Sequence, residues 1–207
     1  LVSKRLHADI KDKVREDLAI LKLVALFTPK LRDAVQEIEE HLDMEMNLTQ
    51  ELRNIKFVAE IWKTHPTIHV VTPVEELCTP DEIVMQRAPG KPLHSWIYEA
   101  TAEEKNKVAH QLVEFVFGTL ERGFLYADIH YGNFFVDGDH LTVLDFGLLK
   151  HLVDPFWSHL LHFRDTIMKN NFREFFEASR KIGIVTGDAE RMFAYFRLQY
   201  EPWFSPD

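Results

Sequence analysis

The sequence contains a single cysteine, Cys78, among its 207 residues. One thiol can form neither an internal disulfide nor a thiolate metal cluster, so the sequence favours a reducing compartment. Positive charge is also scarce, because 24 Lys and Arg residues face 33 Asp and Glu residues, for a net charge of -9. Such a chain lacks the clustered cations that neutralise nucleic-acid phosphates, so we expect no nucleic-acid partner.

Long apolar runs are missing as well. The most apolar stretch, Ile20 to Phe27, is interrupted by Lys22 and is too short to span a bilayer. No signal peptide is recognisable, and the first residue is Leu1 rather than Met, which predicts a fragment or a processed form. We expect a location in the cytoplasm or at the periphery of a membrane.

The first part of the chain shows helical patterns and then a change of pattern. Apolar residues recur at helical spacing over residues 10–25, behind a predicted N-cap at Asp9, and again over residues 31–62, as one long helix or two in series. Residues 70–77 and 83–85 predict a short antiparallel hairpin around a turn. The Pro- and Gly-containing residues 88–92 are typical of a linker.

The second part of the chain is predicted to be mainly helical. Thr101 to Glu104 fits a capping box at the start of a helix that Gly123 ends. Residues 134–136 and 141–144 predict a second hairpin. Further helices are expected after Asp154-Pro155 and after a capping box at residues 171–174. These patterns predict an α+β chain with a small mixed lobe at residues 1–88 and a helical lobe at residues 89–207.

The strongest chemical signal is a polar loop followed by an Asp-Phe-Gly triplet. Asp128 and Asn133 lie five residues apart on the loop, and Asp145 opens the triplet after the predicted hairpin. Phosphoryl transfer from ATP needs a carboxylate that orients the attacking oxygen, and oxygen ligands for Mg²⁺. The three residues match the kinase catalytic loop and the metal-binding triplet. We therefore predict ATP and Mg²⁺ as cofactors, with Asn133 and Asp145 as metal ligands.

The run Gly123 to Asn133 resembles the loop of the UbiB family of atypical kinases, which reads Gly-x-x-His-Ala-Asp-Pro-His-Pro-Gly-Asn. The resemblance covers nearly the whole chain. Val2 to His7 resembles the family's strand with the ATP-contacting lysine, Glu45 to Asn54 its Glu-x-Asp and Glu-Ala-x-Asn segments, and Met85 to Gly90 its hinge. This implies a protein-kinase-like, two-lobed fold with a partial N-lobe and a mainly helical C-lobe.

The resemblance also implies roles for individual residues. Lys4 would contact the α- and β-phosphates, Glu51 would hold Lys4 in position, and Asp128 would be the catalytic carboxylate. His130 is expected to stabilise the loop through a hydrogen bond rather than to bind a metal. The hinge backbone at Met85, Gln86, Arg87 and Ala88 would contact the adenine, and Glu45, Asn47, Asn54, His130, Phe146 and Gly147 would complete the motifs.

Several positions depart from the family pattern. Asn47 replaces the Asp of Glu-x-Asp, Tyr126 the loop His, Ile129 and Tyr131 the two loop prolines, and Gln86 the hinge Glu. The Ala-rich loop that covers the nucleotide and the upstream Lys-x-Gly-Gln segment are not in this sequence.

The function implied is that of an ATP- and Mg²⁺-dependent phosphotransferase or ATPase of UbiB type, linked to isoprenoid-quinone or lipid metabolism. Its partners would be ATP, an acceptor among lipids, small molecules or proteins, and a membrane surface. Two alternatives stay open. A small-molecule kinase of the aminoglycoside or choline phosphotransferase type has a similar loop but usually lacks a glycine at the place of Gly147. A kinase-like scaffold without activity is compatible with Asn47 and Tyr126.

Overall fold

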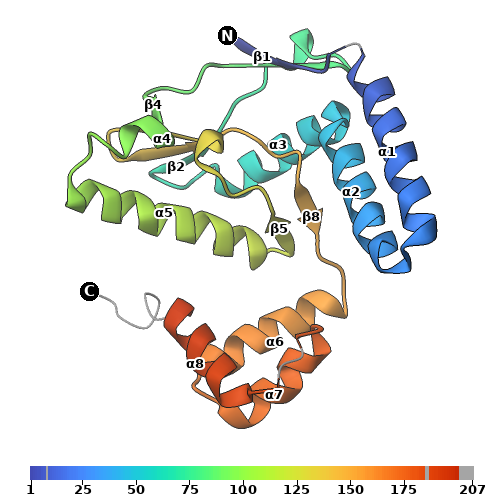
Figure 1. The fold of residues 1–207 in the computed structure, drawn as a ribbon. Helices are drawn as coiled ribbons and strands as arrows, with labels where there is room; N and C mark the ends of the chain where they lie inside the picture. The colour runs from blue at the N-terminus through green and yellow to red at the C-terminus, as the bar shows by residue number, and fades with distance from the viewer. Residues whose placement is uncertain (8, 185–186, 201–207) are drawn as a thin grey trace. The chain divides into compact units, whose positions relative to one another are not determined.

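The structure, a computed structural model, describes residues 1–7, 9–184 and 187–200 (Figure 1). The chain packs into two compact units. The first comprises residues 1–120 and 125–150, and the second residues 121–124 and 151–207. This division does not test the lobe boundary expected between residues 88 and 89, which stays a prediction.

The first unit contains two sheets. Strands β1 and β3 pair antiparallel, with Lys4 opposite Ile83. The other sheet has the order β2-β7-β6-β4, in which β2 runs parallel to β7 and the remaining pairs are antiparallel. The strands span Val2–Arg5 (β1), Ile68–Val70 (β2), Glu82–Met85 (β3), Lys91–Pro92 (β4), Phe134–Asp137 (β6) and His140–Val143 (β7).

A glycine is required where the chain enters β4. Gly90 has a φ of 76°, and a Cβ at this position would lie 2.0 Å from the carbonyl oxygen of Val136. Only a residue without a side chain lets the segment before β4 approach β6 this closely. The sharp turn after the hinge segment is therefore built into the sequence.

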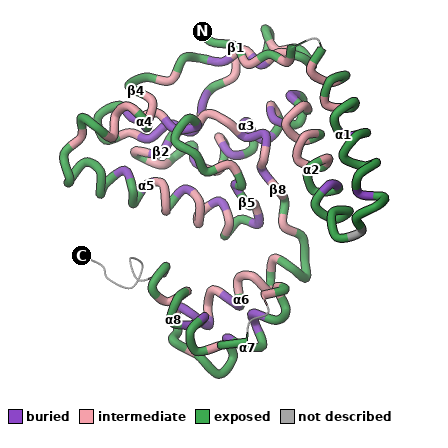
Figure 2. Tube along the Cα trace, viewed as in Figure 1, coloured by how far each residue is buried: buried purple, intermediate pink, exposed green. Residues whose placement is uncertain are grey.

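Helices surround these sheets in the first unit. Helix α3 packs on β2, and α5 packs on β7, while α1 and α2 form an antiparallel pair. Ile55, Phe115 and Leu141, from α3, α5 and β7, are fully buried. Figure 2 shows buried stretches along both α3 and α5. The helical segments are α1 (Ile10–Phe27), η1 (Pro29–Leu31), α2 (Arg32–Glu45), α3 (Leu48–Trp62), η2 (Glu75–Leu77), α4 (Leu93–Trp96), α5 (Ala102–Leu120) and η3 (Tyr131–Asn133).

The second unit is a cluster of three helices, α6 (Phe156–Met168), α7 (Phe172–Lys181) and α8 (Ala189–Tyr200). The chain passes between the units through strands β5 (Phe124–Tyr126) and β8 (Leu149–His151), which form a two-stranded sheet. The helices pack around buried aromatic rings, with the centroids of Phe163 and Phe175 5.3 Å apart. This unit has its own small apolar core.

Most elements expected from the sequence are confirmed, and with them the α+β class. The capping box forms, because Thr101 Oγ1 accepts from the Glu104 backbone N–H and Glu104 Oε2 accepts from the Thr101 backbone N–H. The hairpin β6–β7 forms, and Asn171 caps α7 through the Glu174 backbone N–H. Asp154 accepts from the Ser158 backbone N–H, although α6 begins at Phe156, one residue later than expected.

Two local predictions are confirmed only in part. Asp9 is the N-cap residue of α1 as expected, but its side chain makes no capping hydrogen bond. Its backbone carbonyl accepts from the Lys13 N–H, and its carboxylate lies 3.9 Å from Lys13 Nζ. The hairpin over residues 70–85 forms only in part, since Val74 and Gln86 donate backbone hydrogen bonds across it to Val84 and Thr72. Strand β2 pairs instead with β7, and β3 with β1, because partners distant in the sequence bury these apolar residues better than a local hairpin would.

Candidate active site

The side chain of Lys4 lies between two carboxylates in the first unit. Its Nζ is 2.8 Å from Glu51 Oε1 and 2.7 Å from Asp145 Oδ2. Burial alone would lower the pKa of Lys4, but the negative charges of Asp145 and Glu51 raise it above its ordinary value. The chain thus brings together three residues that are separated by up to 141 positions in the sequence.

Glu51 is held by the start of α3. The side chain of Asn47 accepts a hydrogen bond of 2.9 Å from the Gln50 backbone N–H and caps this helix, one turn before Glu51. Glu51 is only 1% exposed, and its Oε2 is buried without a hydrogen-bond partner among the described residues. Burial and the nearby Asp145 raise the pKa of Glu51 to about 7, against the opposing effect of Lys4.

The Asp-Phe-Gly segment is held in place at several points. Asp145 Oδ1 accepts from the Gly147 backbone N–H at 2.9 Å, and Asn54 Nδ2 donates to the Phe146 carbonyl at 2.8 Å. The Phe146 ring is fully buried. Burial tends to raise the pKa of Asp145, yet Lys4 and the Gly147 N–H hold it below its usual range. This segment therefore presents an ionised carboxylate to Lys4.

Glu45, from the end of α2, also belongs to this cluster. A Cβ placed on Gly147 would lie 3.4 Å from Asp145 Oδ1 and 3.5 Å from Glu45 Oε1, so both carboxylates flank the glycine. Burial and the negative charge of Asp145 raise the pKa of Glu45, with an opposing effect from Lys4. Lys4 therefore lies near a cluster of three carboxylates, those of Glu45, Glu51 and Asp145.

The polar loop before β6 forms its own hydrogen-bond network. Asn133 Nδ2 donates to Asp128 Oδ2 at 2.7 Å and to the Asp128 carbonyl at 3.1 Å. His130 Nδ1 accepts from the Gly132 backbone N–H at 3.0 Å, which is the loop-stabilising bond expected from the sequence. The neutral ring then carries its proton on Nε2, which lies 3.5 Å from Asp128 Oδ2.

The β6–β7 hairpin joins the two motifs. Phe134 and Val143 are opposite residues of the hairpin, and the Leu144 backbone N–H donates to the Asn133 carbonyl at 2.9 Å. Asn133 and Asp145 therefore flank the open end of one hairpin. Because Nδ2 of Asn133 is used on Asp128, its amide oxygen Oδ1 is the atom that could bind a cation.

The donor atoms at this site suit a hard cation. Carboxylates of Asp145 and Glu45 and the amide of Asn133 supply the oxygen ligands that Mg²⁺ prefers. In the part of the chain that the structure describes, no three His, Cys, Asp or Glu side chains converge at metal-binding distance. The chemistry of the residues fits Mg²⁺, and phosphate oxygens would have to complete its coordination.

Tyr126 is a buried residue that the motifs alone do not explain. It is 1% exposed, and its ring packs edge-on against Phe115 and Phe146, at centroid distances of 5.2 and 5.8 Å. Its hydroxyl has no hydrogen bond among the described residues, and burial raises the pKa of Tyr126 well above its ordinary value. The sequence showed Tyr126 as a departure from the loop pattern but not as part of an aromatic core.

The expected hinge segment follows β3. Met85 is buried, Gln86 and Arg87 are exposed, and Ala88 is half-buried. The Gln86 backbone N–H already donates to the Thr72 carbonyl at 2.8 Å. The adenine contact predicted for this segment stays a prediction.

The chain is similar to known proteins over most of its length. The family model described as ABC1 atypical kinase-like domain matches residues 1–179. The chain is 24% identical, over 99% of its length, to the "Probable protein kinase UbiB" of Xylella fastidiosa strain M23, and 26% identical, over 92%, to the protein of the same name from Shewanella pealeana. It spans about two fifths of these relatives, 41% and 38% of their lengths.

A solved structure shares the fold. The structure of Rv3197 from Mycobacterium tuberculosis, described as a complex with erythromycin, matches with a TM-score of 0.77 at 21% identity and covers 97% of this chain and 54% of that one. The expected partial kinase-like fold is therefore confirmed. With a family model that matches most of its length, the chain belongs to the ABC1 atypical kinase-like family.

Proposed function

We propose that this chain is the nucleotide-binding part of an ATP- and Mg²⁺-dependent phosphotransferase or ATPase of UbiB type. The observation that carries the proposal is the position of Lys4 Nζ, 2.8 Å from Glu51 and 2.7 Å from Asp145. A buried acidic partner for a phosphate-binding lysine, next to an acidic metal ligand, is the arrangement that protein kinases need for ATP.

In this proposal Glu51 positions Lys4, and Lys4 binds phosphate oxygens. The Lys4–Asp145 pair must open for this to happen, because the ammonium group and the carboxylate otherwise satisfy each other. Glu51 keeps hold of Lys4 during the exchange, since it is buried at the start of a capped helix. Asp145 is then available to a cation together with Asn133.

Asp128 takes the role of the carboxylate that orients the attacking oxygen. Asn133 fixes one of its oxygens through a hydrogen bond of 2.7 Å, which leaves Asp128 Oδ1 to accept from a hydroxyl or a water. Mg²⁺ bound to Asn133 and Asp145 would neutralise charge on the phosphates and hold them in place.

The proposal is tested by the melting temperature of the chain with and without Mg-ATP. A ligand at about a hundred times its dissociation constant stabilises a protein by about 2.7 kcal/mol, which is an easily measured rise. We expect this rise in the wild type, a much smaller one in Asp145→Asn, and none when EDTA replaces Mg²⁺. ATP hydrolysis would be assayed next.

Asp137→Asn is the matched control. Asp137 lies on the same hairpin and is exposed, so this variant loses the same charge without touching Lys4. An equal rise in the wild type, Asp145→Asn and Asp137→Asn would place nucleotide binding elsewhere. A wild type without any rise would contradict the proposal.

One observation favours the scaffold as a second candidate. Both oxygens of Asp145 already accept hydrogen bonds, Oδ2 from Lys4 and Oδ1 from Gly147. A site closed in this way can serve as a stable contact surface without turnover. If the cellular role survives in Asp145→Asn, the scaffold replaces the enzyme.

The partners we propose with this activity are ATP and an acceptor among lipids, small molecules or proteins. A role in isoprenoid-quinone or lipid metabolism would bring the chain to a membrane surface. Among the described residues, no helix has the length and apolar character needed to cross a bilayer.

A further inference from the structure

Tyr126 carries a buried hydroxyl that has no hydrogen-bond partner among the described residues. Two other buried side-chain oxygens in the described part of the chain share this property, Glu51 Oε2 and Gln111 Oε1. The second polar atom of Glu51 accepts from Lys4, however, and that of Gln111 donates to the Asp139 carbonyl. The side chain of Tyr126 has only the one polar atom and is 1% exposed, so its hydrogen-bonding capacity is wholly unused.

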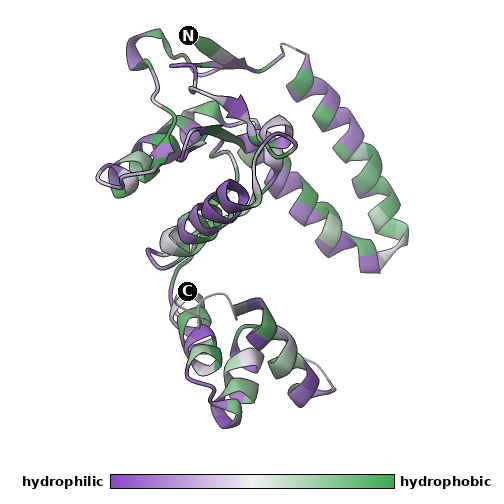
Figure 3. Cartoon of the chain, turned by 90° about the vertical axis from the view of Figure 1, so that its left-hand side faces the viewer, coloured by the Kyte–Doolittle hydropathy of each residue, from purple (hydrophilic) through white to green (hydrophobic). Residues whose placement is uncertain are grey.

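The core around Tyr126 gives no reason for a hydroxyl. Its ring packs against Phe115, Phe134 and Phe146, with centroids 5.2, 6.1 and 5.8 Å away. Figure 3 shows hydrophobic and hydrophilic residues in turn along the helices of this unit, so each helix can direct an apolar face to the interior. A hydroxyl buried there without a hydrogen bond lowers stability, because its bonds to water are lost and none replaces them.

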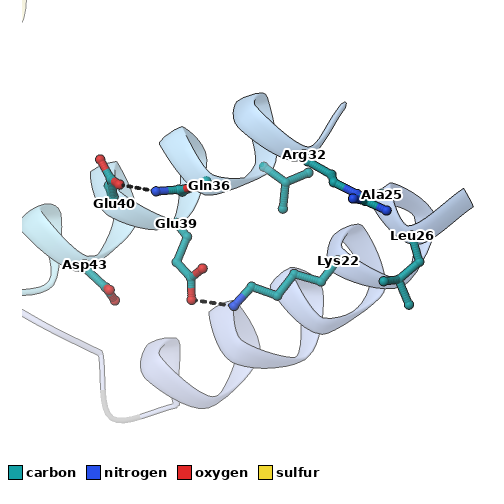
Figure 4. A pocket seen from close by; sticks show the side chains of 9 residues that line it. Lys22, Ala25, Leu26, Arg32, Gln36, Glu39, Glu40 and Asp43 are labelled. Carbon is teal, nitrogen blue, oxygen red and sulfur yellow. Dashed lines mark hydrogen bonds and ion pairs between the residues drawn. The ribbon is translucent and has the colours of Figure 1, made fainter. Parts of the chain in front are cut away.

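Polar groups at the surface of the same unit are paired even though water is available to them. In the cleft between α1 and α2, Lys22 Nζ lies 2.6 Å from Glu39 Oε1, and Gln36 Nε2 donates to Glu40 Oε1 at 3.0 Å (Figure 4). The unpaired hydroxyl of Tyr126 therefore differs from the way in which these side chains are arranged, and it needs an explanation of its own.

The groups that act on this hydroxyl are those of the candidate active site. Burial, and then the negative charges of Asp145 and Asp128, raise the pKa of Tyr126, and the side chain of Asn133 opposes them. The hydroxyl is therefore a neutral O–H donor close to two carboxylates. Tyr126 ends strand β5, which pairs with β8 shortly after the Asp-Phe-Gly segment, so the backbone fixes the ring beside that segment.

Both oxygens of Asp145 are occupied by other donors in this structure. Oδ1 accepts from the Gly147 backbone N–H at 2.9 Å, and Oδ2 accepts from Lys4 Nζ at 2.7 Å. The proposed function requires Lys4 to leave Asp145 for the phosphates, and this step removes the partner of Oδ2. A carboxylate in a half-buried site then needs a new donor.

We propose that Tyr126 is a positioning residue whose hydroxyl donates a hydrogen bond to Asp145 when Lys4 moves from this carboxylate to the phosphates of the nucleotide. The hydroxyl then holds Asp145 in the orientation in which it faces a cation together with Asn133. Carboxylates that bind metals are commonly held by such a donor, whose loss lowers metal affinity by about ten- to a hundredfold. The metal-linked part of this role rests on the proposed function.

Tyr126→Phe tests the role, because it removes the hydroxyl and keeps the ring. Without nucleotide, we expect the variant to melt about 2–4 °C above the wild type, since a buried unpaired hydroxyl is gone. At a fixed ATP concentration, the Mg²⁺ concentration that gives half of the stabilisation should rise about tenfold. A hydroxyl that only supports the fold would instead lower the melting temperature when it is removed. That result, or an unchanged Mg²⁺ midpoint, would overturn the proposal.

Lys4→Met tests the same hydrogen bond without nucleotide. This change frees Asp145 Oδ2 in every molecule, so the hydroxyl of Tyr126 can donate to it. In the Lys4→Met background, Tyr126→Phe should therefore lower the melting temperature by about 2–4 °C, although it raises it when Lys4 is present. An effect of the same sign in both backgrounds would contradict the proposed bond between Tyr126 and Asp145.

Tyr98→Phe is the matched control. It also removes one hydroxyl, from a side chain of the first unit that is 88% exposed, and it should follow the wild type in every measurement. A wild type that Mg-ATP does not stabilise would overturn the proposed function and the metal-linked role with it, while the Lys4→Met comparison would still decide the Tyr126–Asp145 bond. A wild type and a Tyr126→Phe variant that respond equally to Mg-ATP would overturn the role of Tyr126 alone.

Discussion

At the scale of single residues, the site depends on side chains that are each held by a neighbour with a specific geometry. Lys4 is fixed by Glu51 and Asp145, and Asp128 is fixed by Asn133. His130 lies over Gly132, where an added Cβ would lie 2.7 Å from the imidazole Cε1. The glycine therefore leaves room for the ring, and the backbone N–H of the glycine sets the tautomer of the ring.

The two nitrogens of His130 can be tested separately. Asn at this position keeps an acceptor near Nδ1 for the Gly132 N–H, whereas Gln keeps a donor near Nε2 for Asp128. Since a small misplacement of a catalytic group can cost up to about a hundredfold in rate, we expect His130→Asn to reduce ATP hydrolysis by roughly ten- to a hundredfold without a change in melting temperature. His130→Gln should retain more activity but melt earlier. Equal activity losses in both variants would reduce His130 to a support of the loop.

The sequence motifs identified Asp128, Asn133 and Asp145 as site residues, but they did not indicate that Tyr126 is buried in an aromatic core. The match of Asp128, Asn133 and Asp145 to a kinase pattern rests on residue types and spacing, which can be read directly. The packing of Tyr126 against Phe115 and Phe146 joins α5, β5 and the segment after β7. No local pattern encodes that meeting, because it depends on how three elements approach one another.

At the scale of elements, Asn47 has a structural role that its comparison with the family pattern hid. In the sequence, Asn47 was noted only as an amide in place of the Asp of the family's Glu-x-Asp segment. In the structure it ends the helical run from α2 and caps α3 through the Gln50 N–H. The signal was present, since Asn followed three residues later by Gln is typical of a helix start. That reading would have divided residues 31–62 into two helices at the correct place.

Replacing this cap should weaken the helix that carries Glu51. Asn47→Ala removes the acceptor for the Gln50 N–H, and we expect a loss of about 1 kcal/mol in the free energy of unfolding. Asn47→Asp should cost little, because Asp is an equally good N-cap. Denaturant unfolding of the three proteins measures both values. As a control, Thr49→Ala alters the same helix turn without touching the cap. A loss in Asn47→Asp as large as that in Asn47→Ala would show that charge, not capping, decides at this position.

At the scale of the whole molecule, pairing between distant segments decides the architecture. Strand β2 lies parallel to β7, more than seventy residues later in the chain. Next to this pairing, His69 Nε2 and His140 Nδ1 lie 2.9 Å apart, and His140 Nε2 lies 3.4 Å from Asp139. Burial and the neighbouring His140 and His65 lower the pKa of His69. The two imidazole rings can share one proton in this hydrogen bond, whereas two protonated rings at this distance would repel each other.

Acidification should therefore destabilise this sheet. Because the folded state holds the pKa of His69 below 6.5, the unfolded state binds more protons, and stability present above pH 6.5 is lost as the pH falls through the folded value. We expect the melting temperature of His69→Gln to fall less than that of the wild type below pH 6.5. Gln keeps a polar group near Nε2 but does not titrate. His94→Gln, at an exposed position, should follow the wild type. Parallel curves for all three proteins would contradict the assignment.

What the sequence determined by itself was local: helix spacing, capping boxes, the β6–β7 hairpin, the polar loop and the Asp-Phe-Gly triplet. Each depends on residues within a few positions of one another, whose preferences act over one turn of a helix or one hairpin. The tertiary structure alone decided the partners of β2 and β3 and the burial of Tyr126. These depend on which apolar surfaces meet after the chain closes long loops, and burial against a distant partner outweighs the weaker preference for a nearby one.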